Sequence, residues 1–156
     1  MKKIDIDALP VRRGSAYPPP HGAPVAARMR RRLGEAGGLT AFGVNHLTLP
    51  PGCWSSQRHW HSHEDEFVAV LFGEVVLVTD AGEEVLRAGD CAAFRAGDPD
   101  GHHLVNRSGE TAVVLEVGNN APDRDRTVYS DIDMVAEPAE AHFRRRDGSP
   151  YPPTEA

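Results

Sequence analysis

Short runs of β-prone residues, separated by turn-forming residues, constrain the fold of this chain more than any other feature. Between Leu39 and about Val117, runs rich in Val, Leu, Phe and Thr are interrupted by Gly, Asp, Pro and Asn. Such spacing is typical of an all-β sandwich or barrel. The predicted strands lie near 41–49, 54–61, 66–72, 74–79, 83–87, 91–95, 102–107 and 111–117. Gly82 favours a hairpin between 74–79 and 83–87.

The two ends of the chain differ in composition from this middle part. Repeated Pro and Gly residues between 1 and 24 exclude a long helix and predict an extended arm. Residues 25–37 contain good helix formers that end in glycines, which predicts one short helix. Beyond Gly118 the chain is again polar and Pro-rich. We therefore expect one domain, with an N-terminal arm at 1–37, a β-barrel at 38–118 and a C-terminal arm at 119–156.

Charge and hydropathy exclude several classes of partner. The formal net charge is −6, which argues against nucleic acid and anionic membranes. We expect a cytoplasmic protein, because no run of 18 apolar residues occurs and MKKIDIDALP lacks the apolar core of a signal peptide. Arg28 and the run Arg30, Arg31 and Arg32 are typical of a solvated helix face, with an anionic ligand or partner as the functional alternative.

Two cysteines, Cys53 and Cys91, are too few for a disulfide framework, and their spacing is not that of a C-x-x-C motif. We expect both to be free, buried thiols.

The segment HWHSHEDE, from 59 to 66, concentrates groups that bind metals. In a strand, residues i and i+2 point to the same face, so His59 and His61 can present their imidazoles to one point while Trp60 faces the opposite side. A carboxylate from the next strand and an imidazole from a distant strand would complete three nitrogens and one oxygen. Open positions would remain for water or substrate.

The spacing of these residues resembles the first motif of the cupin superfamily, G-x5-H-x-H-x3,4-E-x6-G. Gly52, His59, His61, Glu66 and Gly73 occupy its fixed points. One departure occurs, because six residues rather than five separate Gly52 from His59. This spacing selects Glu66 as the carboxylate, places His63 in the loop between strands, and leaves Glu64 and Asp65 as less favoured acids.

The second cupin motif, G-x5-P-x-G-x2-H-x3-N, is matched later in the chain. Gly89, Gly97, His102 and Asn106 occupy its fixed points. Arg95 stands at the proline position, and four residues rather than two separate Gly97 from His102. The longer loop leaves both His102 and His103 as candidates for the fourth ligand, with His102 favoured.

The resemblance implies an all-β cupin jelly roll that binds one divalent transition-metal ion through His59, His61, Glu66 and His102. The ion could be Zn, Mn, Fe, Ni, Co or Cu, since all accept three imidazoles and a carboxylate. Segments such as GSAYPPP and RRDGSPYP are similar to a group of small bacterial cupins described as sugar-phosphate-isomerase-like.

Two functions are compatible with this resemblance. The favoured one is a metal-dependent enzyme, an isomerase or lyase, acting on a small oxygen-rich molecule such as a sugar, sugar phosphate or hydroxy acid. The alternative is a non-catalytic, metal-dependent binding or sensing protein. An isomerase needs a base besides the metal, and no buried acid or base other than Glu66 stands out in the sequence.

For four further residues near the motifs, strand alternation predicts only the direction of the side chain. Arg58 alternates with His59 and is expected at the surface, whereas Gln57 and Cys53 share the parity of His59 and could reach its surroundings. Asn106 shares the parity of His102 in the same way.

Apolar residues occupy both alternating faces of 67–72 and 75–78. One face can line the barrel, and the other needs a cover from the N-terminal arm or a second subunit. We therefore expect a homodimer, as is common among cupins.

Overall fold

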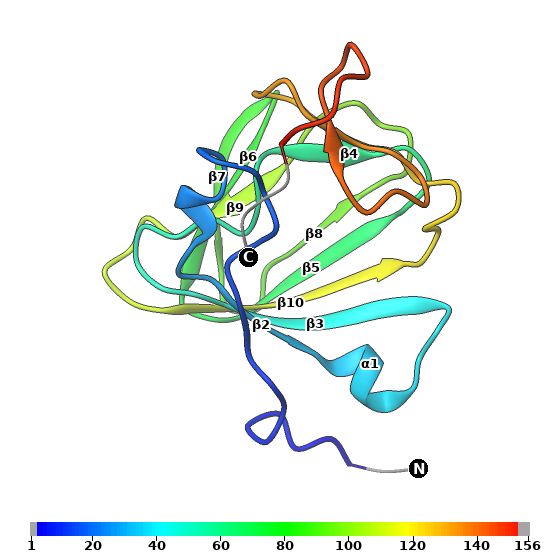
Figure 1. Ribbon diagram of the computed structural model, residues 1–156. Helices are drawn as coiled ribbons and strands as arrows, with labels where there is room; N and C mark the ends of the chain where they lie inside the picture. The colour runs from blue at the N-terminus through cyan, green and yellow to red at the C-terminus, as the bar shows by residue number, and fades with distance from the viewer. Residues whose placement is uncertain (1–2, 153–156) are drawn as a thin grey trace.

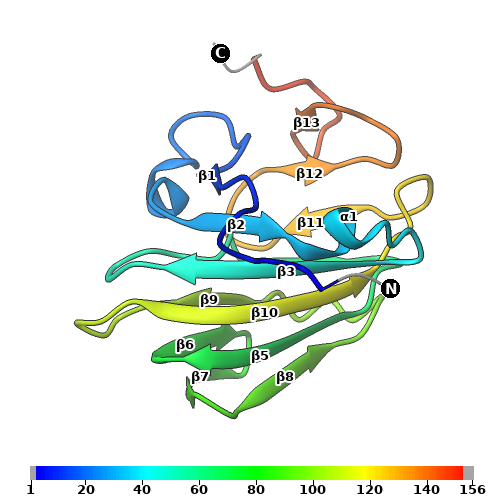
Figure 2. The same cartoon turned by 90° about the horizontal axis from the view of Figure 1, so that it is seen from below.

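The computed structural model describes residues 3–152, which form antiparallel strands with very little helix (Figure 1). The largest sheet has six strands in the order β1-β2-β3-β10-β5-β8. Figure 2 shows β3, β10, β5 and β8 running side by side. Their bounds are β1 Arg12–Arg13, β2 Met29–Arg32, β3 Phe42–Leu49, β5 Glu66–Phe72, β8 Cys91–Phe94 and β10 Ala112–Asn119.

Two smaller sheets make up the rest of the barrel. One has the order β13-β12-β11-β4 and the other the order β7-β6-β9. One isolated bridge joins His59 to His102, the residue before His103–Val105, and another joins Trp54 to Val105. The bounds of the strands in these two sheets are β4 His59–His61, β6 Glu74–Thr79, β7 Gly82–Arg87, β9 His103–Val105, β11 Thr127–Tyr129, β12 Val135–Ala136 and β13 Phe143–Arg144.

The inward face of the large sheet changes from apolar to polar along its strands. At one end, Leu47 and Leu49 of β3 are fully buried opposite Val114 and Ala112 of β10. Two residues on toward the other end, the same alternation brings Asn45 opposite Glu116. The hydrophobic core therefore fills one end of the barrel and leaves polar side chains facing inward at the other. The buried core cluster comprises Leu47, Leu49, Cys53, Val68, Val70, Val75, Leu77, Leu86, Leu104, Ala112 and Val114.

Each strand predicted in the central region has a counterpart, but those predicted at 54–61 and 102–107 are shortened to β4 and β9. The ranges predicted for 66–72 and 74–79 coincide with β5 and β6, and the hairpin between β6 and β7 is confirmed by their register. The helix predicted over 25–37 is wrong in extent. A 3-10 turn, η1, covers Ala23–Val25, β2 covers Met29–Arg32, and the helix α1 covers only Leu33–Gly37. Pairing with β3 overrides the helix propensity of the arginines.

Both ends of the chain contribute strands to the sheets. The N-terminal segment adds β1 and β2 to the large sheet, and the C-terminal segment adds β11, β12 and β13 beside β4. Of the predicted arms, residues 1–2 and 153–156 lie outside the described residues. No helix within 3–152 has the length and apolar character needed to span a membrane.

The two cysteines are free, but only Cys53 is buried. Cys91 is exposed, so its predicted burial is wrong. It lies on β8, which pairs on one side only and forms an edge of the large sheet.

Gly73, the last glycine of the first motif, has a physical requirement at the turn between β5 and β6. Its φ is +73°, a left-handed conformation that side chains rarely adopt. A Cβ atom there would lie 2.9 Å from the carbonyl oxygen of Thr111. Only glycine fits both constraints.

Candidate metal centre

Four side chains from three parts of the fold meet at the polar end of the barrel. β4 is extended, so His59 and His61 point to the same side, toward Glu66 at the start of β5. The ligand atoms of these three residues lie within 4.8 Å of one another. His102 reaches the group from the segment before β9, which the bridge to His59 holds in place.

Glu66 is the common contact of the three imidazoles. Its Oε2 lies 2.8 Å from His102 Nε2, 3.6 Å from His61 Nε2 and 3.8 Å from His59 Nε2. Ligand atoms bound at about 2.0–2.2 Å to a shared ion are about 3–3.5 Å apart. The separations of the three nitrogens from Oε2, between 2.8 and 3.8 Å, bracket that spacing.

Hydrogen bonds at Nδ1 set the orientation of two of the rings. His59 Nδ1 donates to the carbonyl oxygen of Gln57 at 2.9 Å, and His61 Nδ1 donates to Oδ2 of Asp125 at 2.6 Å. With Nδ1 carrying the proton, each Nε2 presents a lone pair toward Glu66. The donor set of three nitrogens and one carboxylate therefore fits a first-row divalent metal ion.

The third imidazole, that of His102, is held by packing. The ring of Phe94 stacks on His102 with 3.5 Å between the centroids. His102 Nδ1 is buried and has no hydrogen-bond partner among residues 3–152. Its Nε2 is the nitrogen that contacts Glu66.

Asp125 is a residue of the site that sequence reasoning missed. It lies two residues before Thr127, the first residue of β11, which pairs with His61. Its carboxylate accepts a hydrogen bond from His61 and a second hydrogen bond, of 2.9 Å, from the backbone N–H of His63. The side chain of Asp125 is only 7% exposed. No motif spacing connects position 125 with position 61, because the connection depends on the pairing of β11 with β4.

Burial and neighbouring charges shift the pKa values of the candidate ligands in different directions. Burial, opposed by the charge of Glu66, lowers the pKa of His59 to about 3, so its imidazole is neutral at pH 7. Burial would raise the pKa of Glu66, but the hydrogen bond with His102 and the charges of His59 and His61 lower it to about 2. Burial would also lower the pKa of His61, but the hydrogen bond to Asp125 and the charge of Glu66 raise it.

The alternative ligands considered from the sequence point elsewhere or make other contacts. Glu64 accepts a hydrogen bond from the backbone N–H of Ala121 at 2.7 Å. Asp65 accepts a hydrogen bond from the backbone N–H of Ala96 at 2.8 Å. Glu64 Oε2 also comes within 4.0 Å of His61 Nδ1, on the side of the ring that faces Asp125.

The two alternative histidines are similarly engaged. His63 is exposed and contacts the Ser62 hydroxyl, whereas buried His103 donates from Nδ1 to the carbonyl oxygen of Ser56 at 3.0 Å.

The other residues near the motifs make contacts within the protein. They are Arg58, Asn106, Cys53 and Gln57. Arg58 points away from His59, as alternation predicts, but its side chain is only 14% exposed because it is ion-paired with Asp131 and Asp80. Asn106 is fully buried and donates to the carbonyl oxygens of Leu49 and Glu110. Cys53 belongs to the hydrophobic core, and Gln57 Nε2 donates to the carbonyl oxygen of His21.

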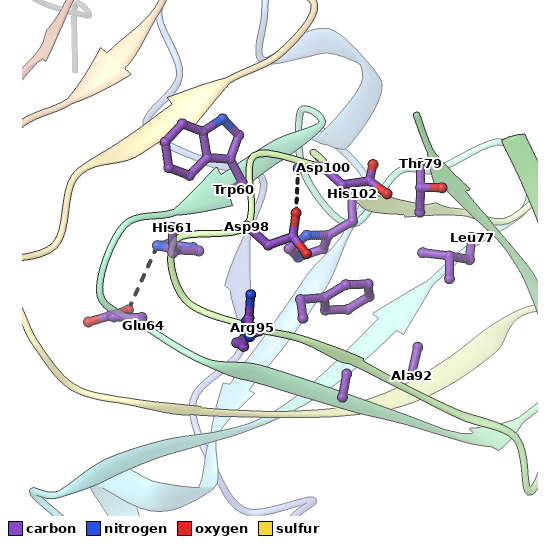
Figure 3. Close-up of a pocket in the computed structure, with 12 residues that line it drawn as sticks. Trp60, His61, Glu64, Leu77, Thr79, Ala92, Arg95, Asp98, Asp100 and His102 are labelled. Carbon is purple, nitrogen blue, oxygen red and sulfur yellow. Dashed lines mark hydrogen bonds and ion pairs between the residues drawn. The ribbon is translucent and has the colours of Figure 1, made fainter. Parts of the chain in front are cut away.

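Two cavities open onto the centre. The first, called here the Trp60 cavity, has a volume of about 280 Å³, and Figure 3 shows His61 and His102 in its wall. It is also lined by Trp60, Leu77, Thr79, Phe94, Arg95, Asp98 and Asp100. The second, called here the Arg30 cavity, has a volume of about 270 Å³ and exposes His59, His61 and Glu66. Tyr17, Arg28, Arg30, Asn45 and Glu116 are among its other lining residues.

A further inward-facing acid does exist, contrary to the expectation from the sequence. Glu116 on β10 lines the Arg30 cavity, and burial raises its pKa despite an ion pair with Arg30. Strand alternation offered a signal, since Glu116 follows Ala112 and Val114 on one face. A charged residue on the buried face of a strand indicates a polar interior at that level.

Comparison with known proteins decides the family. Residues 45–118 match the family model described as Cupin domain. A crystal structure from Silicibacter pomeroyi, described as a sugar phosphate isomerase from a cupin superfamily, is 47% identical, with 97% of each chain covered and a TM-score of 0.91. The chain belongs to the cupin superfamily. The resemblance and the cupin fold predicted from the two motifs are thereby confirmed.

Other solved structures are similar over most of this chain. A putative sugar phosphate isomerase from Acidithiobacillus ferrooxidans is 28% identical, with 81% of this cupin and 75% of that chain covered and a TM-score of 0.67. A predicted oxalate decarboxylase from Thermotoga maritima is 21% identical, with 77% of this chain and 100% of that chain covered and a TM-score of 0.63. The second likeness concerns the fold alone. No curated protein matches this cupin.

Proposed function

We propose that this cupin binds one divalent transition-metal ion through His59, His61, Glu66 and His102 and is a metal-dependent, isomerase-like enzyme. Its substrate is a small oxygen-rich molecule, namely a sugar, sugar phosphate or hydroxy acid. The observation that carries the proposal is the convergence of three imidazole Nε2 atoms on one carboxylate at the wall of two cavities. The two similar structures described as sugar phosphate isomerases support it.

The chain's own residues prepare this chemistry. The ion, when bound, supplies a Lewis acid that polarises a carbonyl or acidifies a hydroxyl. Gln57 and Asp125 keep the protons of His59 and His61 on Nδ1. Phe94 restricts one side of the centre by stacking on His102. Each cavity is just below the range of about 300–1,000 Å³ that is usual for small-ligand sites, which favours a small substrate.

The test measures isomerisation directly. Elemental analysis of the purified protein gives the metal per chain, and sugar phosphates of three to six carbons are then followed by NMR in D₂O. We expect metal-dependent exchange of the hydrogen beside the carbonyl, and loss of that exchange in His59→Ala. Metal-dependent binding without exchange or turnover would instead assign the protein to the binding or sensing alternative. A wild-type protein that holds no metal under loading conditions would refute both the metal-dependent enzyme and the metal-dependent binding protein.

The proposed assembly is a homodimer formed through the outward face of the large sheet. Phe67 pairs in register with Val117 and Ala93, so the three share this face. Phe67 is 41% exposed, and Phe72 on the same strand is 56% exposed. A second copy of the chain would cover this apolar surface, which is unusual on an isolated protein.

A further inference from the structure

The side chain of Arg30 faces the interior of the barrel. β2 pairs with β3 so that Arg30 lies opposite Leu47, a fully buried core residue. Paired residues of an antiparallel sheet point to the same face. Arg30 therefore belongs to the interior of the barrel, where it lines the same cavity as the metal-binding groups. Its solvated placement on a helix, expected from the sequence, is wrong.

The ion pair with Glu116 fixes Arg30 but leaves some of its N–H donors free. Its Nη2 lies 3.1 Å from Oε2 of Glu116 and 3.4 Å from Oε1. The side chains are 28% and 17% exposed, respectively, so the pair borders the cavity without being sealed from it. Among the described residues, Nη2 is the one guanidinium nitrogen of Arg30 with a hydrogen-bond acceptor. A guanidinium has five N–H donors, so further acceptors can be accommodated.

The neighbouring arginine contributes charge but few free donors. Arg28 Nε donates to the carbonyl oxygen of Gly14 at 2.8 Å, and its Nη1 donates to that of Ser55. These bonds fix the N-terminal segment and leave Arg28 almost completely buried. Of the two arginines in this cavity, Arg30 is the one suited to contact a ligand.

The charge balance of the cavity depends on the metal. Arg28 and Arg30 face three carboxylates, those of Glu64, Glu66 and Glu116. With neutral histidines, the lining carries one excess negative charge, and a divalent ion would convert this to one excess positive charge. The loaded cavity would then attract an anion. In the Trp60 cavity, Arg95 stands alone against the carboxylates of Glu64, Asp98 and Asp100.

We propose that Arg30, positioned by Glu116, binds the anionic end of a small substrate whose hydroxyl or carbonyl oxygens reach the metal centre. The anionic end is a phosphate or a carboxylate, because an arginine fork recognises both. Asn45 and Tyr17 line the same cavity and supply neutral polar contacts beside it. The inference rests on the proposed function, since the ion provides the second point of attachment.

The experiment uses the full chain loaded with Co²⁺, whose visible spectrum reports on coordination independently of affinity. Calorimetry compares glycerol, glycerol 3-phosphate and glycolate as probes. We expect at least one anionic probe to bind about 10- to 100-fold more tightly than glycerol, and Arg30→Gln to remove that advantage while metal content stays at the wild-type level. The identity of the favoured probe distinguishes a phosphate site from a carboxylate site.

Matched variants separate the role of Arg30 from a general effect of charge. Arg32→Gln removes the same charge from an exposed position on β2 and should leave binding unchanged. Arg30→Lys keeps the charge but loses the fork, so binding should be intermediate even if Arg30→Gln fails to fold. Glu116→Gln keeps an oxygen that can accept a hydrogen bond from Arg30 but removes the negative charge that competes with the ligand, so anion binding should be at least as tight as in the wild type.

The outcomes that oppose the inference differ from those that oppose the metal site. Anionic probes that bind no more tightly than glycerol to Co²⁺-loaded protein, or equal losses in Arg30→Lys and Arg32→Gln, would overturn the assignment of Arg30. Failure of the wild-type protein to retain Co²⁺, or a spectrum without histidine coordination, would overturn the proposed function itself.

Discussion

Asp125 accepts a 2.6 Å hydrogen bond from His61 Nδ1, although 64 positions separate the two residues in the sequence. The pairing of β11 with β4 brings them together. Burial would raise the pKa of Asp125, but the bonds from His61 and from the His63 backbone lower it to about 2. The carboxylate is therefore ionised at neutral pH and fixes both the tautomer and the plane of the imidazole.

Replacing this acceptor should weaken metal binding without removing a ligand. In Asp125→Asn, the amide keeps a similar shape but loses the charge that orients His61, so we expect metal affinity to fall about 10- to 100-fold. Competition with a chelator measures the change. Asp123→Asn alters an exposed carboxylate in the same loop and serves as the control. Equal affinity of the two variants would show that Asp125 does not position His61.

Metal binding should release a proton from His61 at low pH. Burial would lower the pKa of His61, but the hydrogen bond to Asp125 and the charge of Glu66 raise it above its usual value of 6.5, so the metal-free imidazole keeps its second proton to higher pH than an ordinary histidine. The ion needs the neutral imidazole, and apparent affinity should therefore fall as the pH drops toward and below this raised pKa. Calorimetry in buffers of different ionisation enthalpy counts the protons. Uptake rather than release would contradict this protonation state.

The roles of the three histidines in HWHSH can be separated by substitution. His59→Ala and His61→Ala each remove an imidazole that faces Glu66, and we expect metal content to fall from about one ion per chain to near zero. His63→Ala removes an exposed imidazole that contacts Ser62 and should leave metal content unchanged. Elemental analysis after dialysis gives the result. Comparable loss in all three would invalidate the assigned ligand set.

Gly73→Ala should destabilise the fold without touching the metal centre. The substitution combines a left-handed φ of +73° with a Cβ only 2.9 Å from the Thr111 carbonyl oxygen. We expect a loss of about 1–3 kcal/mol in the free energy of unfolding, seen as a lower midpoint in urea. Gly109→Ala meets no atom within 4 Å and should change stability by less than about 0.5 kcal/mol.

A charge on the outward face of the large sheet should disrupt the proposed dimer. Phe67→Glu places a carboxylate among the apolar residues Phe42, Ala93 and Val117. Light scattering should give about twice 16.9 kDa for the wild type and 16.9 kDa for the variant. Val85→Glu introduces the same charge at an exposed position of β7, on another sheet, and is expected to remain dimeric. A monomeric wild type would exclude this assembly.

Local patterns were sufficient to predict most of the barrel strands and to bring His59, His61 and Glu66 together. Alternation and turn residues define β5 and β6, and motif spacing singles out His59, His61 and Glu66. The short helix was predicted too long because arginines favour helices, whereas β2 forms through pairing with β3, a contact that its own residues do not encode.

The remaining parts of the site required the tertiary structure. Asp125 reaches His61 only through strand pairing, and the ion pair of Arg30 with Glu116 joins residues that are 86 positions apart in the chain. The inward parity of Glu116 was readable from its apolar neighbours, but its partner was not. Long-range charge pairs leave no periodic signal in one sequence.

The pairing of β11 with β4 also has a consequence for biosynthesis. His61 leaves the ribosome well before Thr127, which follows 66 positions later and belongs to the strand that pairs with it. Until that strand is translated, the His61 imidazole lacks the acceptor that orients it. The nascent chain can therefore expose its histidines but cannot complete their geometry, and we expect stable metal uptake only after nearly the whole polypeptide has been made.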